Sequence, residues 1–348
     1  MMFGLFNDSR PWFRPKSFGL GSGLPIAWQG WLLLGLHVAL ILAAALAAAP
    51  PVERQLTAPG PLAPLAGTLL DAGKRAPVVI IIPGSGPTDR DGNNPLGVTA
   101  APYRLLAQGL AQRGVTTVRI DKRGMFGSKA AIANPNAVTI ADYAADAHTW
   151  AKAARAATGA KCVWLLGHSE GGLVALAAGQ DRSDLCGIIS VAAAGRKLGT
   201  IIREQLVANP ANAPIIAPAY AALARLEARQ RFNNADIPPA LQPLFGEAIQ
   251  PYMIDLLSYD PPRLAASLKL PLLVLQGDRD LQVTPVDARA LVGAQPKAQL
   301  LILPGVNHLL KTVATTDRAS NMATYANPSL PVSLLAIDAI AIFVGKRR

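Results

Sequence analysis

The stretch CVWLLGHSEGGLVALAAG, residues 162–179, joins two apolar runs through a glycine-rich turn. Residues 162–167 have the pattern of a buried strand, and residues 171–179 have that of a helix. Between them, Gly167-His168-Ser169-Glu170-Gly171 follows the spacing Gly-x-Ser-x-Gly. Small residues two positions before and after the serine let strand and helix approach closely around a sharp turn. We therefore expect the turn to project Ser169 as a nucleophile rather than to hold an idle serine.

A serine nucleophile needs a base within hydrogen-bond reach, and the chain has only four histidines. His37 lies in an N-terminal apolar run, and His148 lies within a predicted helix before the serine. His168 is expected to point away from Ser169 because neighbouring side chains diverge in a tight turn. His308, in the loop VNHLL after a predicted strand, is the remaining candidate.

The acid that orients such a histidine is expected in the loop after the preceding strand, where the chain reads QGDRD. Asp280 is the favoured candidate, and Asp278 is the alternative. The carboxylate would hold the imidazole tautomer and stabilise the imidazolium without taking the proton itself.

An oxyanion hole requires two backbone donors near the nucleophile. We expect one from Glu170 and the other from Ser85, in the loop PGSGPTDRDGN at residues 83–93. A phosphate-binding loop is the alternative for these glycines, but the Lys-Ser/Thr ending of a P-loop is missing. Asp89, Arg90 and Asp91 are expected to form an internal ion-pair network that shapes this loop. Arg123, in IDKRGMFGS after the second predicted strand, is expected to have a structural role.

Short apolar runs alternate with helical patterns along most of the chain, which predicts a parallel sheet covered by helices on both faces. Strands are expected at 77–84, 116–121, 162–167, 186–191, 271–277 and 299–305, and helices at 101–114, 139–159 and 284–295, with Thr139 as an N-cap. Residues 196–267 lack a strong strand pattern and are expected to form a helical cap. The apolar pattern at 332–346 predicts a C-terminal helix that packs on the sheet.

The first 50 residues differ in composition from the rest. Three basic residues and one acid in residues 1–23 precede the nearly uncharged segment 24–51, and residues 31–49 have about the length of a membrane-spanning helix. Ala45-Leu46-Ala47 offers a small-x-small cleavage site. We expect residues 1–50 to be a signal peptide or an anchor through 24–49, with an exported, periplasmic domain beyond. Residues 51–64 are expected to be a linker and residues 65–348 one domain.

Composition limits the remaining classes of protein. The 348 residues are 51% hydrophobic and carry a net charge of +11, of which about +9 lies after residue 50. The basic residues are dispersed and aromatic residues are few, so a nucleic-acid partner is not expected. Metal-ligand clusters are not visible, and no cofactor or metal is expected.

Cys162 and Cys186 open adjacent predicted strands and could form a disulfide or remain two buried thiols.

Five motifs taken together resemble the α/β-hydrolases, in particular bacterial carboxylesterases and serine-aminopeptidase-like hydrolases. They are GSGP-x-DRD (84–91), DKRG (121–124), GHS-x-GG (167–172), QG-x-x-D (276–280) and PG-x-NH (304–308). The resemblance implies an α/β-hydrolase fold and hydrolysis of a small-molecule ester through an acyl-enzyme, with a cap that shapes the acyl pocket. A peptidase or amidase using the same residues, and a binding module without activity, are the alternatives.

Overall fold

The computed structural model describes residues 25, 27–47, 51–181, 183–315 and 317–346. The chain divides into two compact units, residues 1–50 and residues 51–348. In the first unit, helix α1 (Trp28–Ala47) covers most of the segment expected to be a signal or anchor. The basic residues before it lie outside the described residues. Within the described part of the chain, no helix is long and apolar enough to cross a membrane.

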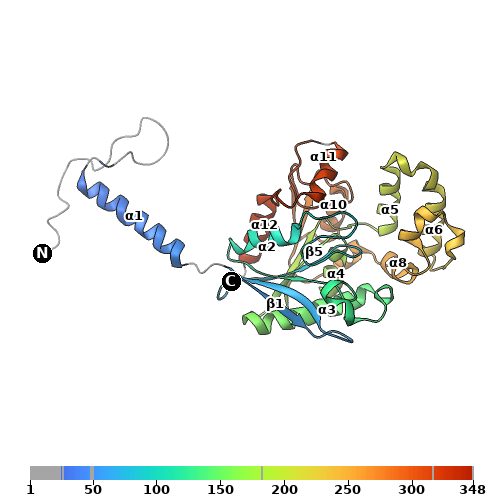
Figure 1. The fold of residues 1–348 in the computed structure, drawn as a ribbon, viewed down its shortest axis with the longest axis horizontal. Coiled ribbons are helices and arrows are strands. Elements are labelled where there is room, and N and C mark those ends of the chain that lie inside the picture. Colours follow the sequence, from blue (N-terminus) through green and yellow to red (C-terminus); the bar gives the residue numbers. More distant parts are fainter. Residues whose placement is uncertain (1–24, 26, 48–50, 182, 316, 347–348) are drawn as a thin grey trace. The chain divides into compact units, whose positions relative to one another are not determined.

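An eight-stranded sheet forms the centre of the second unit (Figure 1). Its strand order is β1-β2-β4-β3-β5-β6-β7-β8. Strand β2 is antiparallel to β1 and β4, and every other neighbouring pair is parallel. The strands are β1 (Val52–Ala58), β2 (Leu65–Asp71), β3 (Val78–Ile82), β4 (Thr116–Ile120), β5 (Val163–His168), β6 (Leu185–Val191), β7 (Leu272–Gly277) and β8 (Gln299–Leu303). The expected mostly parallel sheet is thereby confirmed.

Strand β1 is the main departure from the sequence-based expectation. It lies within residues 51–64, which were expected to be a linker, so that prediction is wrong for Val52–Ala58. The first four of its seven residues are all exposed. The strand pairs with β2 along its whole length. An edge strand held by backbone pairing carries little hydrophobic periodicity, so sequence patterns do not reveal it.

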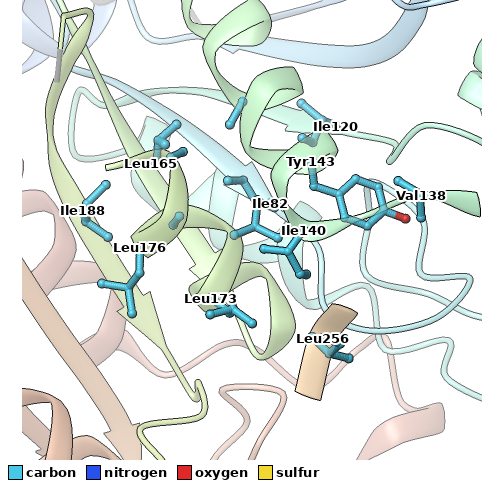
Figure 2. Packing of buried hydrophobic residues seen from close by; sticks show 14 of the residues in the cluster. Ile82, Ile120, Val138, Ile140, Tyr143, Leu165, Leu173, Leu176, Ile188 and Leu256 are labelled. Carbon is cyan, nitrogen blue, oxygen red and sulfur yellow. The ribbon is translucent and has the colours of Figure 1, made fainter. Parts of the chain in front are cut away.

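Helices cover both faces of the sheet. Helices α2 and α12 pack on one face, where the rings of Trp164 and Phe343 lie 5.0 Å apart between centroids. On the other face, Ile82, Leu165 and Ile188 of the sheet pack with residues of α3 and α4 (Figure 2). The helices of these two layers are α2 (Pro102–Ala111), α3 (Ile140–Thr158), α4 (Glu170–Ala178), α10 (Pro285–Ala294) and α12 (Leu334–Gly345). The expected C-terminal helix on the sheet is α12.

Helix α3 begins where the sequence predicts. The Thr139 hydroxyl accepts a hydrogen bond from the Asp142 backbone N–H, and the Asp142 carboxylate accepts one from the Thr139 N–H. This reciprocal capping box satisfies two donors that the first helical turn leaves open.

The interval 196–267, called the cap below, contains helices and no strand among its described residues. Its helices are α5 (Leu198–Val207), α6 (Ile216–Glu227), α7 (Gln242–Phe245), α8 (Gln250–Leu257) and α9 (Pro261–Ser267), and α11 (Arg318–Ala323) follows later in the chain. Helices α5, α6 and α8 lie together beyond one end of the strands in Figure 1, whereas α9 contacts α4 and α10. Leu223, Phe245 and Met253 of the cap are buried and belong to the same apolar cluster as helix α3.

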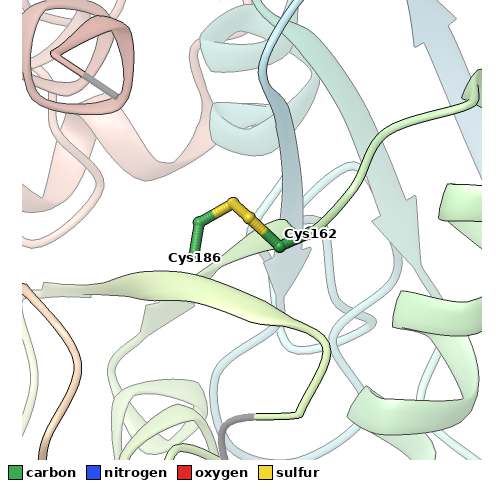
Figure 3. Close-up of a disulfide and its surroundings, with 2 residues drawn as sticks. All are labelled: Cys162 and Cys186. Atoms are coloured by element: carbon green, nitrogen blue, oxygen red, sulfur yellow. A yellow bond between two sulfur atoms is a disulfide. The ribbon is translucent and has the colours of Figure 1, made fainter. Parts of the chain in front are cut away.

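Cys162 and Cys186 form a disulfide, with Cα atoms 5.3 Å apart (Figure 3). It joins the residue before β5 to the second residue of β6, and these strands are hydrogen-bonded neighbours. The structure thus takes the first of the two alternatives that the sequence left open for these cysteines.

Candidate active site

Ser169 lies between the end of β5 and the start of α4, in the predicted strand-turn-helix element. Its backbone has φ 54° and ψ −122°, a conformation rarely adopted by residues with a side chain. The turn is tightly packed, because a Cβ atom on Gly167 would lie 1.9 Å from the Gly171 carbonyl oxygen. The flanking glycines therefore allow the strained turn that projects the serine.

Asp280 and His308 lie together as the buried, hydrogen-bonded pair expected from the sequence. The His308 Nδ1 lies 2.8 Å from the Asp280 Oδ2, and both side chains are at most 5% exposed. The other carboxylate oxygen accepts hydrogen bonds from the backbone N–H groups of Gln282 and Val283. Burial alone would raise the pKa of Asp280, but His308 and these N–H donors outweigh burial and hold the pKa below its usual range. The carboxylate is therefore ionised and oriented toward the imidazole.

Asp278, the alternative acid, has a different environment. Its carboxylate accepts a hydrogen bond of 2.7 Å from the Gly305 backbone N–H, and its side chain is 38% exposed. This hydrogen bond joins the loop after β8 to the loop after β7. Of the two aspartates, only Asp280 contacts His308 among the described residues.

Among the described contacts, His168 makes its hydrogen bonds to residues other than Ser169. Its Nε2 donates to the His308 carbonyl oxygen at 2.8 Å, and the two imidazole rings lie 4.7 Å apart between centroids. Its Nδ1 therefore accepts from the Tyr103 hydroxyl at 2.8 Å. Burial, with the neighbouring His308 ring, lowers the pKa of His168 to about 3, so this imidazole is neutral. His308 thus lies directly against the residue that precedes Ser169.

The hydrogen bonds of the described residues do not include one between the Ser169 hydroxyl and the His308 imidazole. Hydrogen bonds between a nucleophile and its base are often long or poorly aligned in an unliganded enzyme and tighten when substrate binds.

The two predicted oxyanion donors, Ser85 and Glu170, both line one cavity together with Ser169. Among the described residues, neither backbone N–H donates to another protein group. Gly84 packs closely on Ser169, because a Cβ atom on Gly84 would lie 3.2 Å from the Ser169 Cβ. Two open donors beside the serine hydroxyl are what an oxyanion hole requires.

A buried lysine lies beside these donors. The Lys122 Nζ donates to the Gly84 carbonyl oxygen at 2.6 Å and to the Glu170 Oε1 at 3.0 Å. The Lys122 and Glu170 side chains are 2% and 3% exposed. The amine also lies 5.2 Å from the centre of the Tyr143 ring.

The loop at residues 83–93 is fixed by the ion pairs that its composition predicts. Arg90 binds the Asp121 carboxylate, and Asp91 binds Arg119, which also pairs with Glu53 of β1. Arg123 makes a bidentate pair with Asp146 on α3. Asp89 has another role: its carboxylate accepts hydrogen bonds from the N–H groups of Asp91 and Asn93, within its own loop.

The cavity that contains Ser169 has a volume of about 760 Å³. Most of its lining is apolar and comes from the cap and from the loop after β4. Its apolar lining residues include Met125, Phe126, Leu198, Ile201, Ile202, Leu244, Met253 and Leu256. The described residues contain no cluster of three or more His, Cys, Asp or Glu side chains that could hold a metal ion.

Three residues of this site were not identified from the sequence. Tyr103 and Lys122 lie in segments expected only to form a helix and a turn, and His168 was set aside. The motif DKRG contains Lys122, but the pattern indicates no role for this lysine. For His168, the available signal was its position next to Ser169 in the sequence. Its hydrogen-bond partners Tyr103 and His308, however, are 65 and 140 residues away in the chain.

Comparison with known proteins agrees with this architecture. Esterase EstD of Thermotoga maritima is 27% identical over 241 residues, which are 67% of this chain and 54% of that protein. The chain thus spans about half the length of the curated relative it matches. Est1E from Butyrivibrio proteoclasticus superposes with a TM-score of 0.53 at 16% identity, over 84% of this chain and 99% of that one.

A puromycin-hydrolyzing peptidase of Mycobacterium tuberculosis gives the same TM-score at 18% identity, over 85% of this chain and 39% of that one. At such identities, the structural likeness concerns the fold alone. The model of the Alpha/beta hydrolase family matches residues 78–313, which include Ser85, Ser169, Asp280 and His308. Because this match covers more than half of the chain, the protein belongs to the α/β-hydrolase family.

Proposed function

We propose that the protein is a serine hydrolase that cleaves small-molecule carboxylic esters through an acyl-enzyme. The observation that carries the proposal is the buried Asp280–His308 pair against the strained turn of Ser169, beside two open backbone donors. The relative matched over 241 residues is an esterase, which favours an ester as substrate.

In the proposed reaction, His308 takes the proton of the Ser169 hydroxyl while the serine oxygen attacks the ester carbonyl carbon. Asp280 keeps the proton-bearing Nδ1 of His308 directed toward itself, so Nε2 is the base. The Ser85 and Glu170 N–H groups bind the oxyanion that forms. His308 then protonates the departing alcohol and activates a water that hydrolyses the acyl-enzyme.

The peptidase alternative receives no support from the acidic residues of the cap. An enzyme that reads a substrate's amino terminus is expected to direct acidic side chains into its cavity. Glu204, Glu227 and Asp236 are instead paired with arginines of the cap or its base. Of the cap acids, none lines the described cavity. We therefore favour the ester.

Turnover of p-nitrophenyl butyrate by wild type and Ser169→Ala tests this function. We expect loss of activity by many orders of magnitude, because the whole nucleophile is removed. Parallel assays with an aminoacyl anilide separate esterase from peptidase. Activity of Ser169→Ala close to that of wild type would exclude the assignment of Ser169.

We also propose that the domain is exported. The Cys162–Cys186 disulfide supports this, because disulfides persist mainly in oxidising compartments such as the bacterial periplasm. The expected test is amino-terminal sequencing of the protein released from bacterial cells by osmotic shock. A start shortly after Ala47 would fit a cleaved signal. Retention of residues 1–47 in a membrane fraction would indicate an anchor, and recovery only in the cytoplasm would overturn the proposal.

A further inference from the structure

The geometry points to Lys122 as the positioning residue of the oxyanion hole: it orients and polarises the peptide group whose N–H is the Ser85 donor. This inference rests on the proposed function. It concerns a side chain that touches neither the nucleophile nor its base in the described contacts.

The argument begins with one peptide group. The Gly84 carbonyl and the Ser85 N–H belong to the same planar unit, and in a trans peptide they point in opposite directions. No cis peptide bond occurs among the described residues. Lys122 therefore fixes the direction of the Ser85 N–H when its Nζ binds the Gly84 carbonyl oxygen at 2.6 Å. A charged donor on the carbonyl also withdraws electron density and makes the N–H a stronger donor.

The same lysine reaches the second donor's residue. Its Nζ lies 3.0 Å from the carboxylate of Glu170, whose own backbone N–H is the other open donor. Lys122 thus bridges the loop after β3 and the first residue of α4. These two segments must keep a fixed separation if both donors are to meet one oxygen atom.

Gly84 is also held from its other side. Its backbone N–H donates to the Tyr103 hydroxyl at 3.1 Å, and that hydroxyl binds His168. Hydrogen bonds therefore fix the peptide groups on both sides of Gly84. Of these contacts, only the one from Lys122 acts on the peptide group that carries the Ser85 N–H.

Stability alone explains the buried pair poorly. Removing a lysine and a glutamate from water costs free energy, and an apolar pair of similar volume often gives equal or greater stability. The protein nevertheless keeps this buried ion pair beside Ser169, which is understandable if the pair serves the reaction.

The test compares Lys122→Met with Lys122→Met/Glu170→Gln, using p-nitrophenyl butyrate. We expect kcat to fall about 100-fold in both variants, comparable to losing one oxyanion donor, while KM changes little. The single variant leaves a buried unpaired carboxylate and is expected to be less stable. The double variant removes that charge and restores stability, but it does not restore the cation on the Gly84 carbonyl. A merely structural role predicts that the double variant recovers kcat, and this result would overturn the inference.

Arg123→Met is the matched control. Arg123 is the next residue in the chain and pairs with Asp146 and Asp142, both on α3, and its described contacts include neither oxyanion donor. We expect it to lower the melting temperature while kcat stays near that of wild type. An equal loss of kcat in Arg123→Met would show that any buried charge in this turn has the effect, which also overturns the inference.

Binding of a boronic acid, which forms a tetrahedral anionic adduct with the serine, gives a readout independent of turnover. We expect its affinity to fall by about the same factor as kcat/KM in the double variant.

Labelling of wild-type Ser169 by a fluorophosphonate distinguishes failure of the proposed function from failure of the inference about Lys122. A wild-type protein that neither labels nor hydrolyses esters overturns the proposed function together with the inference. A reactive wild type whose double variant keeps full kcat and boronate affinity overturns the inference alone.

Discussion

At the scale of single residues, two aspartates only two positions apart in one loop have different environments. Asp280 is buried against His308, and Asp278 is partly exposed on a backbone N–H. We expect Asp280→Asn to lower kcat about 10³- to 10⁴-fold, because an amide can donate to Nδ1 and so stabilise the wrong imidazole tautomer. We expect Asp278→Asn to stay within about twofold of wild type. Steady-state kinetics of both variants checks the assignment, which fails if their effects are reversed.

Lys311 makes stability depend on pH. It is fully buried, its Nζ binds the Leu330 carbonyl oxygen, and burial lowers its pKa from 10.5 to about 8. Between pH 8 and 10.5 the folded protein has lost this proton while the unfolded chain keeps it, so the free energy of unfolding rises with pH. Below pH 8 both states are charged, and this contribution is constant.

Denaturant unfolding at pH 8.0, 8.8 and 9.5 measures the slope. We expect Lys311→Met to remove most of the rise seen in wild type. The measurements stay below pH 10 because of two tyrosines. Burial raises the pKa of Tyr103 and Tyr143 in the folded protein, so near pH 10 they ionise first in the unfolded chain and lower the free energy of unfolding. Equal slopes in wild type and variant would contradict the role of Lys311.

At the scale of elements, the β5–α4 turn depends on glycines that touch backbone. A Cβ atom on Gly171 would lie 2.3 Å from the Ile82 carbonyl oxygen, whereas one on Gly293, within α10, would meet nothing within 4 Å. We expect Gly171→Ala to destabilise the fold by at least about 3 kcal/mol, since β3 cannot move aside without losing its sheet pairing. Gly293→Ala should be neutral or stabilising by up to about 1 kcal/mol. Thermal unfolding of the two variants compares them directly, and similar melting temperatures would refute the packing argument.

The same turn shows how much the sequence predicts. Periodicity and glycine spacing fix β5, the turn and α4, because strand, turn and helix are determined locally. The ends of the parallel strands then bring Asp280 and His308 to the same edge, as chain order suggested. The contacts of Lys122 with Gly84 and of His168 with His308 were not predictable, because they depend on the distances between loops that are far apart in sequence. Strands β1 and β2 were both missed, and β1 carries little sequence signal because backbone pairing with β2 defines it.

At the scale of the whole molecule, the disulfide lies at the opposite end of β5 from the reaction. Ser169 follows the last residue of the strand, and Cys162 precedes the first, so roughly 20 Å separates them. We expect Cys162→Ala/Cys186→Ala to lose about 3 kcal/mol of stability, because the bond closes a loop of 24 residues in the unfolded chain. Below the melting temperature, kcat and KM should be unchanged. A lower kcat in the fully folded variant would contradict this expectation, because it would show that the disulfide affects the active site.

The early position of strand β1 would also constrain the order of events during the proposed export. Only residues 48–51 lie between the cleavage site expected after Ala47 and the first residue of β1, Val52, which pairs with Asp71. A peptidase must hold several residues on both sides of the bond it cuts in an extended form, and β1 is fixed once the sheet has formed. Processing after Ala47 would therefore have to precede the docking of β1. The timing of cleavage, and not the sequence of the site alone, would then decide whether the enzyme is released.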